Sequence, residues 1–212
     1  MKLASVHNLD IVDCINAANQ GYPRNPVPLP SPGVGGPCLT KDPYILSASL
    51  ESNTAGGLLL PKYSREVNEG MYLHIANAVI RQLKGIGKEL SKCRILLCGL
   101  AFKGNPETGD IRNSAALEIF QLLKNEVKEV SGHDPVVRMQ EILDNGLNPI
   151  LDIVEAFTNQ DAVLFLNNHV FYEKINVFEL LRLMNEKPVF FDGWHTFYPD
   201  EILNIRPSVY MG

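Results

Sequence analysis

The spacing of apolar residues predicts helices in the first part of the chain. Over residues 64–83, apolar side chains recur at three and four positions, which places them on one face of a helix. A second helical pattern covers residues 3–19, where Asp10 is placed to cap the segment 11–18. Residues 45–51 can form a short third helix. The longest helix must turn its apolar stripe toward the following domain or a second subunit, and the stripe consists of Val67, Met71, Ile75, Ala78, Val79 and Leu83.

After Ser91 the pattern changes to short apolar runs that alternate with helical segments. Strands are predicted over residues 94–100, 127–130, 162–166 and 189–191, and helices over residues 114–124, 150–157 and 177–184. This alternation indicates a parallel sheet that is covered on both faces. The predicted fold class is therefore α/β, with a helical, dimerising remainder of a central domain over residues 1–90 and a small doubly wound, Rossmann-like domain over residues 91–212. Ligands of such a sheet bind at the carboxyl ends of its strands.

Composition and charge limit the classes of binding partner that are expected. The chain is 45% hydrophobic and 20% charged, as is ordinary for a globular protein, and its net charge of -5 gives no reason to bind nucleic acid or an anionic membrane. The longest apolar runs are far shorter than the roughly 20 residues of a membrane span. The first residues do not have the pattern of a signal peptide. We therefore expect a cytoplasmic protein with a small-molecule partner.

A proline- and glycine-rich segment contains the first candidate for chemistry. Residues 21–43 include seven prolines and four glycines, so a long, shaped loop is expected there. Three glycines precede Cys38, and they let the backbone approach a ligand closely. Lys41 supplies a cation that favours thiolate, and Asp42 supplies a carboxylate that can move protons. The pattern favours a nucleophilic cysteine; the alternative is a Gly/Pro-rich turn that happens to contain a thiol.

The other three cysteines are interpreted as packing residues. Cys93 and Cys98 flank the predicted buried strand, and Cys14 lies on the apolar pattern of the first helix. No spacing among the four cysteines matches a zinc site, so free thiols and no bound metal are expected.

The second candidate is the loop over residues 98–114. It runs from the carboxyl end of a strand to the start of a helix, which Ser114 or Asn113 would cap. Lys103 and Arg112 are thereby brought near a helix N-terminus, where a phosphate is most easily held. The alternative is that both are solvated loop charges.

Together, the two segments resemble the UDP-glucose/GDP-mannose dehydrogenase family. The motifs are Gly-x-Gly-Gly-x-Cys-x-x-Lys-Asp-Pro over residues 33–43, and Gly-Leu-Ala-Phe-Lys, Asp-x-Arg-x-Ser over residues 99–114. The resemblance extends over essentially the whole chain. Its further landmarks are Pro23-Arg24, His133-Asp134-Pro135, Asp161-Ala162-Val163 with His169, Asp192-Gly193-Trp194 and a last strand near residues 209–212.

The resemblance implies a two-step oxidation of the C6 hydroxymethyl of a nucleotide sugar to a carboxylate, with two NAD and water. Cys38 would attack the C6 aldehyde to give a thiohemiacetal and then a thioester. Asp42 would assist the hydrolytic water, and Lys41 would lie near the nicotinamide. Arg112 would reach the NAD phosphate from across the domain cleft.

The resemblance also implies substrate contacts and a partner. Lys103, Gly35 and Gly36 would contact the nucleotide sugar, and Arg24 would reach the sugar in the neighbouring subunit of a homodimer formed through the helix over residues 64–83. The form Gly-Gly-Pro-Cys-Leu-x-Lys-Asp-Pro is closer to the branch that acts on UDP-N-acetylhexosamines, such as UDP-N-acetyl-mannosamine, than to the UDP-glucose branch.

The sequence departs from the family at one point. The NAD-binding domain with its glycine fingerprint is absent, so we expect a fragment or a truncated reading frame that is inactive alone. The alternative is a catalytically silent dimerisation or UDP-sugar-binding module. A cysteine hydrolase is disfavoured because no histidine lies in a recognisable base motif.

Overall fold

The computed structural model describes residues 6–7, 9–51, 59–206 and 208–212. The chain forms two compact units, Met1–Ser31 and Pro32–Gly212. In the first unit, helix α2 (Ile11–Asn19) is capped by Asp10, as predicted. The side chain of Asp10 accepts hydrogen bonds from the backbone N–H groups of Val12 and Asp13 at 2.8 and 3.1 Å. Most of the helix predicted before it lies outside the described residues.

The packing interpretation of Cys14 is wrong. The thiol is exposed, and α2 buries none of its residues. Within the Met1–Ser31 unit the helix is followed by a loop that the Asn19 side chain closes, with bonds to both backbone groups of Val27 at 2.8 and 2.9 Å.

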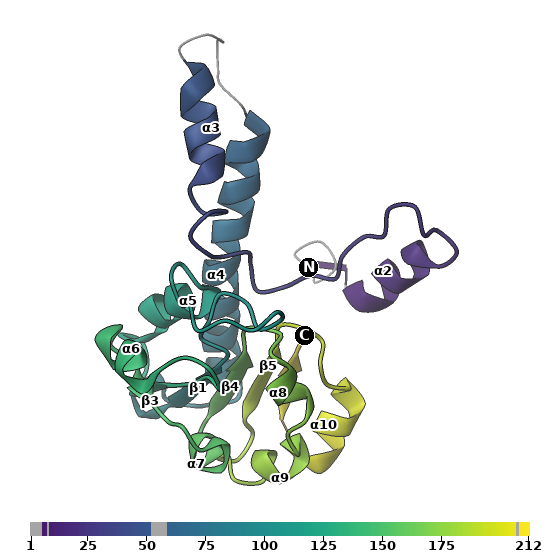
Figure 1. Cartoon of the computed structure of the whole chain (residues 1–212). Coiled ribbons are helices and arrows are strands. Elements are labelled where there is room, and N and C mark those ends of the chain that lie inside the picture. Colours follow the sequence, from purple (N-terminus) through teal and green to yellow (C-terminus); the bar gives the residue numbers. More distant parts are fainter. Residues whose placement is uncertain (1–5, 8, 52–58, 207) are drawn as a thin grey trace. The chain divides into compact units, whose positions relative to one another are not determined.

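The second unit contains a sheet of six parallel strands in the order β3-β2-β1-β4-β5-β6 (Figure 1). This order is that of a doubly wound fold, which confirms the predicted class. In register, Leu97 of β1 lies beside Gly132 of β2 and Leu164 of β4. The strands are β1 (Arg94–Cys98), β2 (Glu129–His133), β3 (Asn148–Pro149), β4 (Ala162–Phe165), β5 (Val189–Asp192) and β6 (Val209–Met211).

Successive residues of each strand enter two different cores, because both faces of the sheet are covered. Ile95 and Leu97 pack on one face, against helices α4, α5 and α6, while Leu96 packs on the other. That other face is covered by α7, α8, α9 and α10 (Figure 1). The helices are α5 (Ala115–Leu123), α6 (Met139–Asp144), α7 (Ile153–Phe157), α8 (Val170–Glu173), α9 (Val177–Leu181) and α10 (Pro199–Ile205), and a 3-10 turn, η1 (Leu90–Lys92), precedes β1.

The predicted long helix is α4 (Leu59–Gly85), and it packs on the sheet. Ile75, Val79 and Leu83 of its apolar stripe are buried there, whereas Val67 is 65% exposed. The stripe therefore faces the sheet only over its second half. The helix begins earlier than predicted because Pro61 lies in the first turn, where no helical N–H bond is lost.

Helix α3 (Asp42–Glu51) lies beside the first part of α4 (Figure 1). It begins at Asp42, before the predicted start at residue 45, so the predicted loop is shorter at that end. The helices α6, α8 and α10 and the strand β3 were not predicted. With two and four residues, β3 and α8 are too short for a periodic pattern. Among the described residues, no helix is long and apolar enough to cross a membrane.

Candidate functional site

The candidate site lies where the strand order reverses. From β1 the sheet continues through β2 in one direction and through β4 in the other, and ligands of such sheets bind at the carboxyl ends beside this point. The loop over residues 99–114 leaves β1 there and leads into α5. It contains Lys103 and Arg112, as predicted. Ser114 is the cap of α5, because its side chain accepts from the N–H of Leu117 at 3.2 Å.

One carboxylate fastens the first part of this loop. Asp134, which directly follows β2, is 4% exposed. One oxygen accepts from the backbone N–H groups of Leu100 and Ala101 at 2.7 and 3.1 Å. The other accepts from Val136 and Val137 at 2.9 and 3.0 Å. The aspartate of the His-Asp-Pro motif therefore ties the loop after β1 to the loop after β2.

The loop after β4 fastens the next part. Asn168 accepts from the backbone N–H groups of Gly104 and Asn105 at 3.0 and 3.2 Å. Gly104 lies so close to this loop that a Cβ atom would stand 2.1 Å from the backbone nitrogen of His169. Only glycine fits there, so the loop around Lys103 is held between the ends of β2 and β4.

The two predicted cations differ in their surroundings. The ammonium of Lys103 lies 5.5 Å from the ring centre of Phe102 and has no ion-pair partner within the described residues. The Arg112 guanidinium donates hydrogen bonds to both carboxylate oxygens of Asp110, with Nε–Oδ1 at 2.9 Å and Nη2–Oδ2 at 2.6 Å. This bonding lowers the pKa of Asp110. Lys103 is therefore the more available cation for a phosphate.

The cysteine loop packs directly on the loop over residues 99–114. The backbone N–H of Gly36 donates to the carbonyl of Asn113 at 3.2 Å. A Cβ atom on Gly35 would lie 2.2 Å from that carbonyl oxygen, and one on Gly36 would lie 2.9 Å from the Phe102 ring. The close approach that these glycines allow is thus to the second loop. Their contact with substrate stays a prediction.

Helix α4 holds the same loop from the other side. The Asn68 amide accepts from the N–H of Val34 at 2.7 Å and donates to its carbonyl at 3.1 Å. Arg65, only 5% exposed, donates to the same carbonyl at 3.2 Å, and Gly33 lies against the Tyr72 ring. These three side chains were not predicted from the sequence. Their spacing of three, then four, along one helix face was the available signal.

Cys38 opens the turn into α3. Its carbonyl accepts from the N–H groups of Lys41 and Asp42 at 3.1 and 2.9 Å, and its thiol is exposed. The Lys41 ammonium forms an ion pair with Asp42, which raises the pKa of Lys41. Hydrogen bonding to Asp110 raises the pKa of Arg112, and the charge of Cys38 contributes as well.

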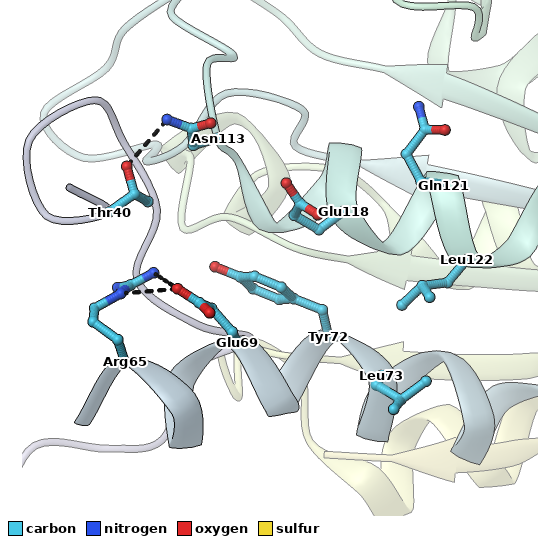
Figure 2. Close-up of a pocket in the computed structure, with 9 residues that line it drawn as sticks. All are labelled: Thr40, Arg65, Glu69, Tyr72, Leu73, Asn113, Glu118, Gln121 and Leu122. Carbon is cyan, nitrogen blue, oxygen red and sulfur yellow. Dashed lines mark hydrogen bonds and ion pairs between the residues drawn. The ribbon is translucent and has the colours of Figure 1, made fainter. Parts of the chain in front are cut away.

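A pocket of about 460 Å³ lies beside this junction (Figure 2). Thr40 and Asn113 form one wall and are joined by a hydrogen bond of 3.1 Å. Arg65 and Glu69, an ion pair at 3.2 Å, line it from α4. Neither Cys38 nor Lys103 lines this pocket, so it neighbours the predicted site without containing it.

Two predictions are not tested by this geometry. Arg24 is exposed in the Met1–Ser31 unit, and its contact with a sugar stays a prediction. The described residues do not form a usual dinucleotide site either, because Gly104, in the turn after β1, is pressed against His169 rather than open to a pyrophosphate.

Comparison with known proteins agrees with the predicted resemblance. Residues 96–199 match the model of the UDP-binding domain of the UDP-glucose/GDP-mannose dehydrogenase family. The UDP-N-acetyl-D-mannosamine dehydrogenase of Pyrococcus horikoshii is 33% identical over 90% of this chain and 42% of its own length. The chain thus spans less than half the length of this relative.

Solved structures show the same fold. The UDP-D-ManNAc dehydrogenase structure from Pyrococcus horikoshii has a TM-score of 0.77 and 30% identity, covering 93% of this chain and 43% of its own. The NDP-N-acetyl-D-galactosaminuronic acid dehydrogenase from Methanosarcina mazei has a TM-score of 0.77 and 27% identity, covering 88% of this chain and 39% of its own. Fold, motifs and matched domain agree, and the chain belongs to the UDP-glucose/GDP-mannose dehydrogenase family.

Proposed function

We propose that this chain supplies the nucleotide-sugar-binding and thiol-bearing part of a cytoplasmic, NAD-dependent UDP-sugar 6-dehydrogenase. The observation that carries the proposal is the packing of the Cys38 loop on the Lys103 loop, through Gly36, Phe102 and Asn113. The substrate class is a UDP-N-acetylhexosamine. The names of both relatives support this class, because each refers to an N-acetylated sugar.

Two features of the chain support the binding of a diphosphate. Lys103 offers an ammonium without an ion-pair partner in the described structure, at the carboxyl end of β1. The N-terminus of α5, a helix of nine residues, lies at the end of the same loop and adds its dipole. The loop is fixed on both sides by Asp134 and Asn168, so little order has to be gained on binding.

Covalent chemistry would take place at Cys38. Its thiolate adds to the C6 aldehyde, an S–C bond forms, and the carbonyl oxygen takes a proton to give a thiohemiacetal. Oxidation of the thiohemiacetal to a thioester would remove a hydride from C6 and the hydroxyl proton, and it would require a hydride acceptor such as NAD, for which the described residues form no usual site. Water then adds to the thioester, Asp42 takes its proton, and the C–S bond breaks to return the thiolate. The thiol keeps the aldehyde in place between the two oxidations.

An assembly of two chains is part of the proposal. Tyr63, Val67 and Leu73 on α4 are 56%, 65% and 51% exposed. Tyr44, Ile45 and Leu46 on α3 are also exposed. Exposed apolar side chains gathered on two neighbouring helices can mark an interface, and a homodimer would cover them. The same observation favours the second candidate function, a catalytically silent dimerisation and UDP-sugar-binding module.

The test measures the melting temperature of the chain with UDP-N-acetyl-mannosamine, UDP-glucose and UDP. A ligand that binds only the folded state raises the melting temperature, so a rise is expected with UDP-N-acetyl-mannosamine. Lys103→Ala should diminish that rise, whereas Lys128→Ala, directly before β2 at the opposite edge of the sheet, should not. A folded chain that shows no rise with any of the three ligands contradicts the proposal.

Mixing the chain with NAD and these UDP-sugars tests the second candidate. We expect no NADH from the chain alone, because the described residues form no usual dinucleotide site. NADH production would overturn that expectation and exclude the silent module. Alkylation of Cys38 should be faster than that of the other three thiols, and equal rates would remove its assignment as nucleophile.

A further inference from the structure

Asn113 joins the two loops of the candidate site. Its backbone carbonyl accepts from the N–H of Gly36 at 3.2 Å, and its side-chain amide donates to the hydroxyl of Thr40 at 3.1 Å (Figure 2). The Thr40 hydroxyl in turn donates to the carbonyl of Gly36 at 2.8 Å. The three residues form a closed ring of hydrogen bonds.

Two residues of this ring lie on either side of the proposed nucleophile, Cys38, in the sequence. Gly36 lies two positions before Cys38 and Thr40 two positions after it. The thiol itself is exposed, so the backbone on its two sides sets its direction. Asn113 fixes both sides at once, to the loop that contains Lys103.

Asn113 is itself well anchored. It lies between Arg112, which is bound to Asp110, and Ser114, the fully buried cap of α5. Its φ of 53° is in the left-handed region, where asparagine is more frequent than other side chains. A role as a turn residue explains this φ. It does not explain the bond from the amide to Thr40.

We propose that Asn113 is a positioning residue, which aligns the Cys38 thiol with C6 of a nucleotide sugar held by the loop over residues 99–112. The inference rests on the proposed function. It assigns to Asn113 the coupling between the nucleotide-binding loop and the cysteine loop, and it assigns no contact between Asn113 and the substrate.

The test compares variants on the two sides of the amide–hydroxyl bond. Asn113→Gly keeps the backbone at positive φ and removes the amide. Thr40→Val removes the hydroxyl, and Thr40→Ser restores it. Iodoacetamide alkylation of Cys38 is measured with and without saturating UDP-N-acetyl-mannosamine, alongside the dissociation constant and the melting temperature of each variant.

In the parent chain, the bound sugar should slow alkylation of Cys38. Asn113→Gly should weaken this protection about fivefold, the effect of one lost hydrogen bond. Thr40→Val, which also loses the bond to the Gly36 carbonyl, should weaken it at least as much. The dissociation constant should change by less than about twofold in both. Thr40→Ser should protect like the parent. The double variant should be no worse than Thr40→Val alone, because that substitution already removes the amide–hydroxyl bond.

Results that contradict the positioning role of Asn113 differ from those that contradict the proposed function. If the sugar protects Cys38 equally in the parent, Asn113→Gly and Thr40→Val, the positioning role is wrong and the proposed function stands. If Asn113→Gly abolishes binding while Thr40→Val does not, Asn113 is a binding residue and the inference also fails. If UDP-N-acetyl-mannosamine does not bind the folded parent chain, the proposed function itself fails. Should Asn113→Gly not fold, Thr40→Val decides alone.

Discussion

At the scale of single residues, one buried carboxylate holds two loops of the candidate site together. Asp134 accepts four backbone hydrogen bonds from two loops. A buried N–H without an acceptor is costly, so this one carboxylate determines the path of the loop to Lys103.

Replacing that carboxylate should destabilise the fold. Asp134→Ala leaves the N–H groups of Leu100, Ala101, Val136 and Val137 without this acceptor, and we expect a loss of at least about 3 kcal/mol in the free energy of unfolding. Urea denaturation measures it. Asp144→Ala on α6, whose exposed carboxylate binds only Gln140 among the described hydrogen bonds, should cost less than about 1 kcal/mol. Equal losses would contradict the assigned role of Asp134.

His133 gives the fold a pH dependence of known sign. The ring is 2% exposed and lies 3.0 Å from the Tyr172 hydroxyl. Burial lowers its pKa below 6.5, although Asp134 and the Leu151 carbonyl oppose the shift. As the pH falls, the unfolded chain therefore takes up a proton on His133 at a higher pH than the folded chain does. The stability that the neutral His133 ring contributes is fully present above pH 6.5. It is lost as the pH falls toward the lower pKa that His133 has in the folded chain.

The measurement is the free energy of unfolding at about pH 7.5 and about pH 5.5. The parent chain should be less stable at the lower pH, and His133→Asn, which has no group that titrates in this range, should lose less stability over the same interval. A variant with the same or a steeper fall would show that other groups cause the dependence.

At the scale of elements, the two halves of α4 contact different parts of the molecule. Its second half packs on the sheet through Ile75, Val79 and Leu83, and its first half clamps the cysteine loop through Arg65 and Asn68. The predicted boundary between residues 90 and 91 stays a prediction, but the packing of α4 couples the helix to the sheet in the same unit, Pro32–Gly212.

A pair of substitutions tests this coupling. Leu83→Ala removes a fully buried side chain and should cost about 2 to 5 kcal/mol of unfolding free energy. Val67→Ala, on the same predicted stripe but 65% exposed, should cost less than about 1 kcal/mol. If the two losses are equal, or if Leu83→Ala leaves the unfolding of the sheet unchanged, α4 is not part of the sheet's core.

At the scale of the whole molecule, the exposed apolar side chains of α3 and α4 predict a homodimer. Sedimentation of the chain should give the mass of two copies. Val67→Asp, which introduces a charge on the exposed surface, should shift the equilibrium toward the single chain without altering its helix content. Val136→Asp, which introduces the same charge on the separate loop after β2, is the control and should leave the mass unchanged. A parent chain that sediments as one copy contradicts the prediction.

The sequence by itself determined the class of the fold and the two loops that matter. Alternating strand and helix patterns are local, so residues 94–191 already predicted a parallel sheet, and the motifs around Cys38 and Lys103 already predicted the family. Short elements such as β3 and α8 have too few residues for a periodic pattern, which is why they were missed.

Only the tertiary structure decided what those loops contact. Gly35 and Gly36 approach the second loop, Asp134 binds four N–H groups, and Cys14 is exposed instead of packed. Asn113 meets Thr40 across 73 positions of the chain. Periodicity reports on neighbours a few residues apart, whereas these contacts form only after the sheet has brought distant loops to one edge.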